Sequence, residues 1–213
     1  PIVRNYTWEA LLHLIARDQN ILSLRQIPVR FFRNGVDLGI FFIEEGFGKE
    51  LIESQNRKNG PIIGIDESNG IYFPSVDYDF YDEKKLKKSM PGVYTASKER
   101  LNQIKRKYKA TDFDASNYFD LDAWAKFFAL SDLFGAYHGT VPKSAKLYYN
   151  PSNALFEPII FDSHVGAGKF KYFILADFLN GDPGNCDWLC PYKGWDGLFL
   201  RNPDFIEKYY SWL

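Results

Sequence analysis

The sequence predicts an α+β fold with a β-hairpin in each half and an apolar helix between the two hairpins. Three observations predict it. An Asn-Gly pair at 34–35 separates two runs rich in β-branched and aromatic residues. A strongly apolar helical pattern follows Asp120, and two further β-rich runs flank a Pro-Ser-Asn turn at 151–153. We therefore expect helices and hairpins around a shared core.

Composition places the chain among globular proteins. Its 213 residues suffice for one large domain or two small ones, and 46% hydrophobic with 25% charged residues is typical of a folded protein. The formal net charge of −1 provides no global field for nucleic acid or an anionic membrane surface, so we expect no nucleic-acid partner. No apolar run approaches the roughly 20 residues that cross a bilayer, so no transmembrane segment is expected.

The first half is expected to contain a helix, a hairpin, a second helix and a strand. The first helix spans 7–18, with Thr7 as N-cap and an apolar stripe through Trp8, Leu11, Leu12 and Ile15. His13 lies off this stripe, and a lone histidine on a surface helix is expected to be solvated. The hairpin strands span 27–33 and 36–45, followed by a helix over 47–57 and a strand over 61–66.

A charged run over 77–88 separates the two halves. It changes from acidic to basic and ends in Met-Pro-Gly at 90–92, which is typical of a solvated loop or an exposed helix face. We expect a single domain over 1–213, as a piece of a longer protein, with the boundary between its two approximate lobes, 1–76 and 93–213, in this run.

The second half is expected to begin with a basic helix over 97–108. Asp120 then caps a central helix that ends near Gly135. Its apolar face consists of Leu121, Trp124, Phe127, Phe128, Leu130 and Phe134. The second hairpin has strands at 146–149 and 155–161, and a helix over 173–178, a loop over 181–197 and a last helix from about Pro203 complete the chain.

Several common catalytic and metal motifs are missing. The glycine-containing turn at 166–169 lacks the upstream glycine and the following Ser or Thr of a phosphate-binding loop, and no G-x-S-x-G motif occurs. Cys186 and Cys190 form a C-x3-C pair without two further zinc ligands nearby. A local disulfide or two buried thiols is the expected state of this pair.

Asp162 is the strongest candidate for a metal ligand. It follows the apolar run 158–161, and a carboxylate at the end of a buried strand is costly unless a cation or hydrogen-bond donors meet it. Mg²⁺ would suit this position, although an aspartate that caps the next turn is the alternative. A transition-metal site of His138, Asp162 and His164 is a further possibility.

Four stretches, in order, resemble the CotH kinase family. They are NGVDLGIFFIEE at 34–45, YFDLDAWAKFFALSDLFGAYHG at 118–139, LYYNP with FEPIIFD at 147–151 and 156–162, and LFLRNPDFIEKYY at 198–210. The resemblance covers most of the chain. It implies an atypical protein-kinase-like fold of two lobes that transfers the γ-phosphate of ATP to protein Ser or Thr with Mg²⁺ or Mn²⁺.

The resemblance also implies roles for individual residues. Asp162 matches the metal-binding acid after the second hairpin, and Glu45, with Glu44 as the neighbouring possibility, matches the glutamate that holds a phosphate-binding lysine. His138 stands where many members have the catalytic-loop aspartate. Ser144 falls near the position of their second metal-ligating asparagine.

The chain departs from the family pattern at three positions. Besides His138 and Ser144, Gly64 stands where a phosphate-binding lysine is expected. One possibility is that another lysine substitutes, and Lys143, Lys146 and Lys169 are the candidates. The other is that phosphotransfer is lost and the domain binds or assembles a cell-surface or coat protein. Family members are often exported, so an extracytoplasmic or cell-surface location is expected, and a sugar-binding or structural role for the aromatic surface is the remaining alternative.

Overall fold

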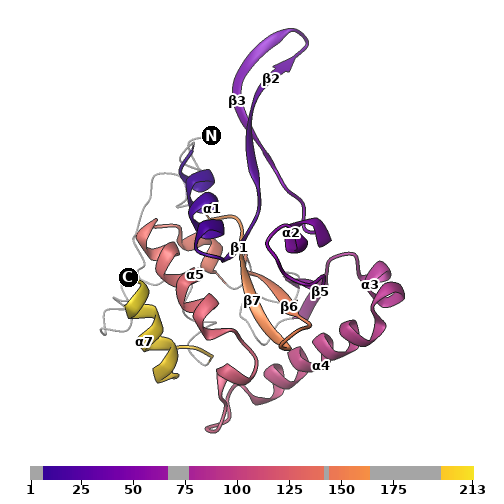
Figure 1. The fold of residues 1–213 in the computed structure, drawn as a ribbon, viewed down its shortest axis with the longest axis vertical. Helices are drawn as coiled ribbons and strands as arrows, with labels where there is room; N and C mark the ends of the chain where they lie inside the picture. The colour runs from indigo at the N-terminus through magenta and orange to yellow at the C-terminus, as the bar shows by residue number, and fades with distance from the viewer. Residues whose placement is uncertain (1–6, 67–76, 142–143, 164–197) are drawn as a thin grey trace.

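The computed structural model describes residues 7–66, 77–141, 144–163 and 198–213 (Figure 1). The sequence expectations for Lys143, His164, Lys169, the helix over 173–178 and the cysteine loop lie outside the described residues. In chain order the elements are α1 (Trp8–Asp18), β1 (Leu22–Ser23), β2 (Gln26–Arg33), β3 (Val36–Glu44), α2 (Lys49–Glu53), β4 (Ile62–Asp66), β5 (Asp77–Phe80), α3 (Glu83–Ser89), α4 (Pro91–Lys107), the 3-10 helix η3 (Ala115–Asn117), α5 (Leu121–Leu133), the 3-10 helix η4 (Tyr137–Thr140), β6 (Lys146–Asn150), β7 (Leu155–Ile160) and α7 (Pro203–Trp212).

Two sheets confirm the α+β class. The larger sheet has the strand order β1-β7-β6-β4-β5, in which β1 runs parallel to β7 and the other pairs are antiparallel. The smaller sheet is the β2–β3 hairpin alone. The larger sheet draws strands from both sides of the charged run over 77–88, and the division into lobes stays a prediction.

The β2–β3 hairpin confirms the turn predicted from Asn34-Gly35. Both residues have positive φ, 51° and 79°, which is the backbone that a two-residue hairpin turn requires. The hairpin projects from the body of the molecule (Figure 1). Its large apolar side chains are mostly exposed, namely Ile27, Phe31, Phe32, Val36, Leu38, Ile40, Phe41 and Ile43.

Helix α5 is the centre of the main core, as predicted. Trp124, Phe127 and Phe128 are buried against the sheet and against the C-terminal residues Phe199 and Phe205. The indole of Trp124 donates a hydrogen bond to the carbonyl of Phe156 on β7 (3.0 Å), so its one polar atom is satisfied inside the core. Helices α1 and α7 pack beside α5 (Figure 1).

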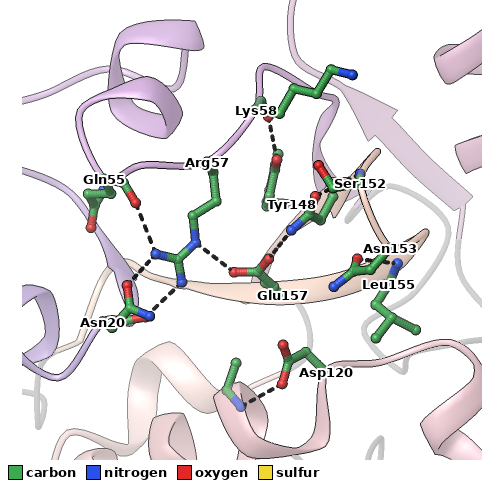
Figure 2. Close-up of polar contacts among 12 residues, drawn as sticks. Asn20, Gln55, Arg57, Lys58, Asp120, Tyr148, Ser152, Asn153, Leu155 and Glu157 are labelled. Carbon is green, nitrogen blue, oxygen red and sulfur yellow. Dashed lines mark hydrogen bonds and ion pairs between the residues drawn. The ribbon is translucent and has the colours of Figure 1, made fainter.

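Both ends of α5 carry the predicted signals. The carboxylate of Asp120 accepts a hydrogen bond from the Ala123 amide (3.1 Å), which satisfies one of the unpaired amides of the first turn (Figure 2). At the other end Gly135 has φ 60°. The amides of Gly135 and Ala136 donate to the carbonyls of Asp132 and Ser131, which is the Schellman pattern that ends a helix.

We predict that Asp120→Ala lowers the free energy of unfolding by about 1 kcal/mol, the usual loss when an N-cap side chain is removed. Urea denaturation monitored by circular dichroism measures this change. Asp120→Asn keeps a carbonyl acceptor at the same position and should stay close to wild type. An equal loss in both variants would show that the cap is not the source of the stability.

Four details of the secondary structure differ from the sequence expectations. The second helix is shorter than predicted, at Lys49–Glu53, and the basic helix begins earlier, at Pro91. Strand β5 occupies the start of the charged run, where a loop or helix was expected. Strand β1 was not foreseen, because its two residues pair in parallel with β7 far along the chain.

Helix α1 was predicted at its correct position, but its buried face is different. The buried side chains are Glu9, Ala10, Leu12, His13 and Ala16, while Trp8 and Leu11 are exposed. The expectation that His13 is solvated was therefore wrong. The helix turns His13 towards β1, where its Nδ1 lies 2.6 Å from the hydroxyl of Ser23.

A buried polar network joins the segment after α2 to β7 (Figure 2). The Arg57 guanidinium pairs with the Glu157 carboxylate (Nε to Oε2, 3.0 Å) and also donates to the backbone carbonyls of Asn20 and Gln55. The other carboxylate oxygen of Glu157 accepts from the Asn150 amide (2.7 Å). Each of the three guanidinium nitrogens thus donates to at least one oxygen atom, as a largely buried charge requires.

None of the helices in the described ranges is long and apolar enough to cross a membrane.

Candidate functional site

The candidate site lies where β7 ends. Asp162 follows this buried strand, and its backbone has φ 50°, in the left-handed region that few residues other than glycine, asparagine and aspartate adopt. Such a backbone costs about 1 kcal/mol or more, and residues held in this way are frequent at functional sites. The Asp162 side chain is 21% exposed, so its carboxylate is partly accessible to solvent.

His138 also lies at the end of β7, in the segment that follows helix α5 and its glycine cap. The Schellman turn at Gly135 ends α5, and η4 then carries His138. Gly139 makes a very close approach to the segment after β7, because a Cβ at this position would lie 2.6 Å from Ser163 Oγ and 2.7 Å from the Phe161 carbonyl oxygen. Only glycine fits this contact, which sets η4 directly against Asp162.

The His138 ring is hydrogen-bonded to Asp162. Nδ1 of His138 lies 3.0 Å from Oδ2 of Asp162 and 3.3 Å from the Asp162 carbonyl oxygen. Both oxygens are acceptors, so we assign a proton to Nδ1, and a neutral ring then carries its lone pair on Nε2. An acid that holds a histidine in this tautomer is the arrangement found where histidine acts as a general base.

Lys146 lies close to the end of β7. It begins β6, is buried, and pairs in the sheet with Ile159 of β7, two residues before Phe161. Its ammonium nitrogen lies 5.3 Å from the centre of the Phe161 ring, within the range of a cation–π contact. Of the sequence-predicted residues, His138 and Asp162 are thus in direct contact, and Lys146 lies over the ring of Phe161, the residue before Asp162.

Gly64 lies directly beside Lys146 on the neighbouring strand. A Cβ on Gly64 would lie 3.8 Å from Lys146 Cδ and 3.6 Å from the Tyr81 ring, which is ordinary van der Waals contact. A side chain from position 64 would therefore enter the space next to the Lys146 stem. Lys146 is thus the candidate lysine that the described residues place beside position 64.

Three aromatic rings pack together beside Lys146 and Gly64. Phe47 packs on Tyr81 and Phe161, with ring centroids 4.6 and 5.1 Å apart. Burial raises the pKa of Tyr81, with a smaller contribution from the nearby negative charge of Asp79. Tyr81 therefore remains a neutral phenol at physiological pH and adds no negative charge beside the lysine.

Glu45 and Glu44 lie at the base of the hairpin. Glu45 pairs with the Arg25 guanidinium and accepts a hydrogen bond from the Arg25 amide (3.1 Å). Glu44 accepts from the side chain of Gln26 (2.9 Å). Glu44 thus contacts the first residue of β2, and Glu45 contacts the residue before it. The role of Glu45 as a partner of a phosphate-binding lysine stays a prediction.

Ser144 is buried two residues before Lys146, and its amide donates to the Val141 carbonyl (2.8 Å). Its predicted role as a metal ligand also stays a prediction. Sequence reasoning did not single out Gly139, Phe161 or Tyr81. The only available signal for Gly139 was its place directly after His138, because its close contact joins segments that are far apart in the chain.

Comparison with protein families gives one result. A family model described as CotH kinase protein matches residues 4–213, essentially the whole chain. Comparison with curated proteins finds no significant match.

Proposed function

We propose, from the premise that this chain belongs to the CotH kinase family, that it transfers the γ-phosphoryl group of ATP to the hydroxyl of a protein serine or threonine. The observation that carries the proposal is the pair of His138 and Asp162, joined at 3.0 Å at the end of β7. Lys146, whose ammonium group lies over the ring of Phe161, the residue before Asp162, supplies positive charge. A base, a metal-binding acid and a cation are the groups that phosphoryl transfer requires.

His138 is proposed to act as the general base. Because Asp162 occupies Nδ1, the lone pair of Nε2 takes the proton of the acceptor hydroxyl. The hydroxyl oxygen then forms a bond to the γ-phosphorus, and the bond from that phosphorus to the bridging oxygen breaks, which releases ADP. Asp162 stabilises the positive imidazolium that results.

The residues present fit a divalent cation such as Mg²⁺ or Mn²⁺. Oδ2 of Asp162 receives His138, and the same carboxylate has a second oxygen, Oδ1. One or two carboxylates together with substrate phosphates are the usual ligands of Mg²⁺ in such sites, so one aspartate is enough when the nucleotide brings the remaining oxygens. When bound, the ion neutralises negative charge on the phosphates.

Lys146 is proposed to bind the phosphates in place of the lysine missing at position 64. Its stem packs beside Gly64, and its ammonium group lies over Phe161, one residue from Asp162. Burial reduces competition from water, so the charge acts on a phosphate more strongly than a surface lysine would.

We predict that Asp162→Asn lowers phosphotransfer at least about 10²-fold, the usual scale when a positioned acid–base pair is broken. Asparagine has the same size and tolerates the left-handed backbone of position 162, so the fold should be kept. The measurement is transfer of labelled phosphate from Mn-ATP to the protein itself and to casein. Asp112→Asn, at an exposed carboxylate, is the control and should be as active as wild type.

The proposal fails if the wild-type protein transfers no phosphate and shows no shift in melting temperature with Mn-ATP. It also fails if Asp162→Asn is as active as the Asp112→Asn control. Circular dichroism of each variant separates a lost site from a lost fold.

A second candidate is a catalytically impaired domain that binds a cell-surface or coat protein outside the cytoplasm. The observation that favours it is the projecting hairpin, whose large apolar side chains are mostly exposed. Extensive exposed apolar surface often marks a protein–protein contact. In this case Asp162→Ala leaves partner binding intact, whereas phosphotransfer by the wild type contradicts the candidate.

A further inference from the structure

A second group of metal-ligating side chains lies outside the proposed phosphotransfer site. Glu9 and His13 are four residues apart on α1, and Glu44 is the last residue of β3. One ligand atom from each residue lies within 4.8 Å of the other two. We propose that Glu9, His13 and Glu44 bind a Zn²⁺ ion that ties the base of the β2–β3 hairpin to α1.

Burial distinguishes this group from an ordinary cluster of surface charges. Glu9 is 3% exposed and His13 is 1% exposed, while Glu44 reaches solvent. The spacing of four residues puts Glu9 and His13 on one face of the helix. Two carboxylates this close repel each other, and a divalent cation shared between them removes that repulsion. The exposed side at Glu44 provides a route by which the ion enters.

Ser23 sets His13 in the tautomer that a metal requires. The Ser23 hydroxyl donates to the His13 backbone carbonyl (3.2 Å), so its oxygen accepts from Nδ1 of the same residue (2.6 Å). With the proton on Nδ1, the ligand atom is Nε2, which is fully buried. Histidines that bind metals commonly donate their other ring N–H to a polar group in this way.

The donor set favours zinc over magnesium or calcium. One imidazole nitrogen and two carboxylate oxygens are ligands that Zn²⁺ accepts in a four-coordinate site with one further ligand. Mg²⁺ and Ca²⁺ prefer oxygen alone. The sheet register places Glu44 opposite Gln26, at the point where the hairpin leaves the body, so an ion there fixes the hairpin to α1.

Titration of the metal-stripped protein with Zn²⁺ by calorimetry tests the proposal. We expect one Zn²⁺ site that depends on Glu44, so that Glu44→Gln weakens its binding at least about tenfold. Ser23→Ala should weaken it about 10- to 100-fold, as expected when the group that orients a metal-binding histidine is removed. Asp37→Asn removes a carboxylate near the opposite end of the same strand and should leave zinc binding unchanged.

The same proteins give a second measurement that does not depend on activity. Zn²⁺ should raise the melting temperature of the wild type and of Asp37→Asn, and Glu44→Gln should lose this rise, while Mg²⁺ has no such effect. Equal zinc affinity in wild type, Glu44→Gln and Ser23→Ala would overturn the proposal. The proposal is also overturned if the wild-type protein binds no Zn²⁺, because the three side chains would then share a proton rather than a metal. Because Glu44→Gln changes an exposed side chain, its fold should be retained.

Discussion

Lys146→Met is expected to lower ATP-dependent phosphorylation about 10²- to 10³-fold, the scale of losing one preorganised group that stabilises charge in the transition state. Methionine keeps an unbranched apolar stem, so the packing on Phe161 and beside Gly64 is retained. The variant therefore removes the charge with little change in shape. Phosphate incorporation measures transfer, and the melting shift with Mn-ATP measures nucleotide binding separately.

A lysine introduced at position 64 on β4, next to β6, tests whether phosphotransfer needs the positive charge at position 146 or accepts it from the neighbouring strand. Gly64→Lys in the Lys146→Met background should recover part of the lost activity. The contacts of a Cβ at position 64 are 3.6–3.8 Å, so the substitution is sterically tolerated. Lys85→Met removes an exposed positive charge on α3 and should leave phosphorylation unchanged. If Lys146→Met and Lys85→Met behave alike, Lys146 does not bind the phosphates.

The positions of Gly64, Lys146, His138 and Asp162 show which features of the site the sequence could predict and which it could not. The order of motifs pointed to His138, Asp162 and a substitute lysine. It could not predict that Lys146 lies beside Gly64, because that neighbourhood depends on β4 pairing with β6 in the sheet. The role of Lys146 as the substitute lysine stays a prediction. The sequence did suggest that His138 and Asp162 lie in one site, but it could not predict the close approach of Gly139 to Ser163 that accompanies their contact.

For the fold as well, local features could be predicted from the sequence and non-local features could not. The turn at Asn34-Gly35 and the two ends of α5 were predictable, because φ preference and capping act within a few residues. The short strand β1 was not, because its pairing with β7 is non-local. The burial of His13 depends on Ser23 and on the packing of α1, which apolar periodicity does not describe.

The largest loss of stability is expected for Arg57→Met. This change leaves the Glu157 carboxylate buried without its cation, and breaking such a pair costs about 3–5 kcal/mol. The loss should be large because Arg57 also joins the carbonyls of Asn20 and Gln55, and thus holds the segment after α2 against β7 (Figure 2). Chemical denaturation at neutral pH measures the free energy of unfolding.

A second change separates the buried charge from the lost packing. Glu157→Gln in the Arg57→Met background removes the unpaired charge but keeps an acceptor for Asn150, so it should recover part of the stability. Arg106→Met breaks an exposed pair with Glu99 and should cost no more than about 1 kcal/mol. If Arg57→Met costs no more than Arg106→Met, water must reach Glu157, and the network does not carry the stability assigned to it. If the double variant is as unstable as Arg57→Met, the loss comes from the bonds of Arg57 to the backbone rather than from the charge left on Glu157.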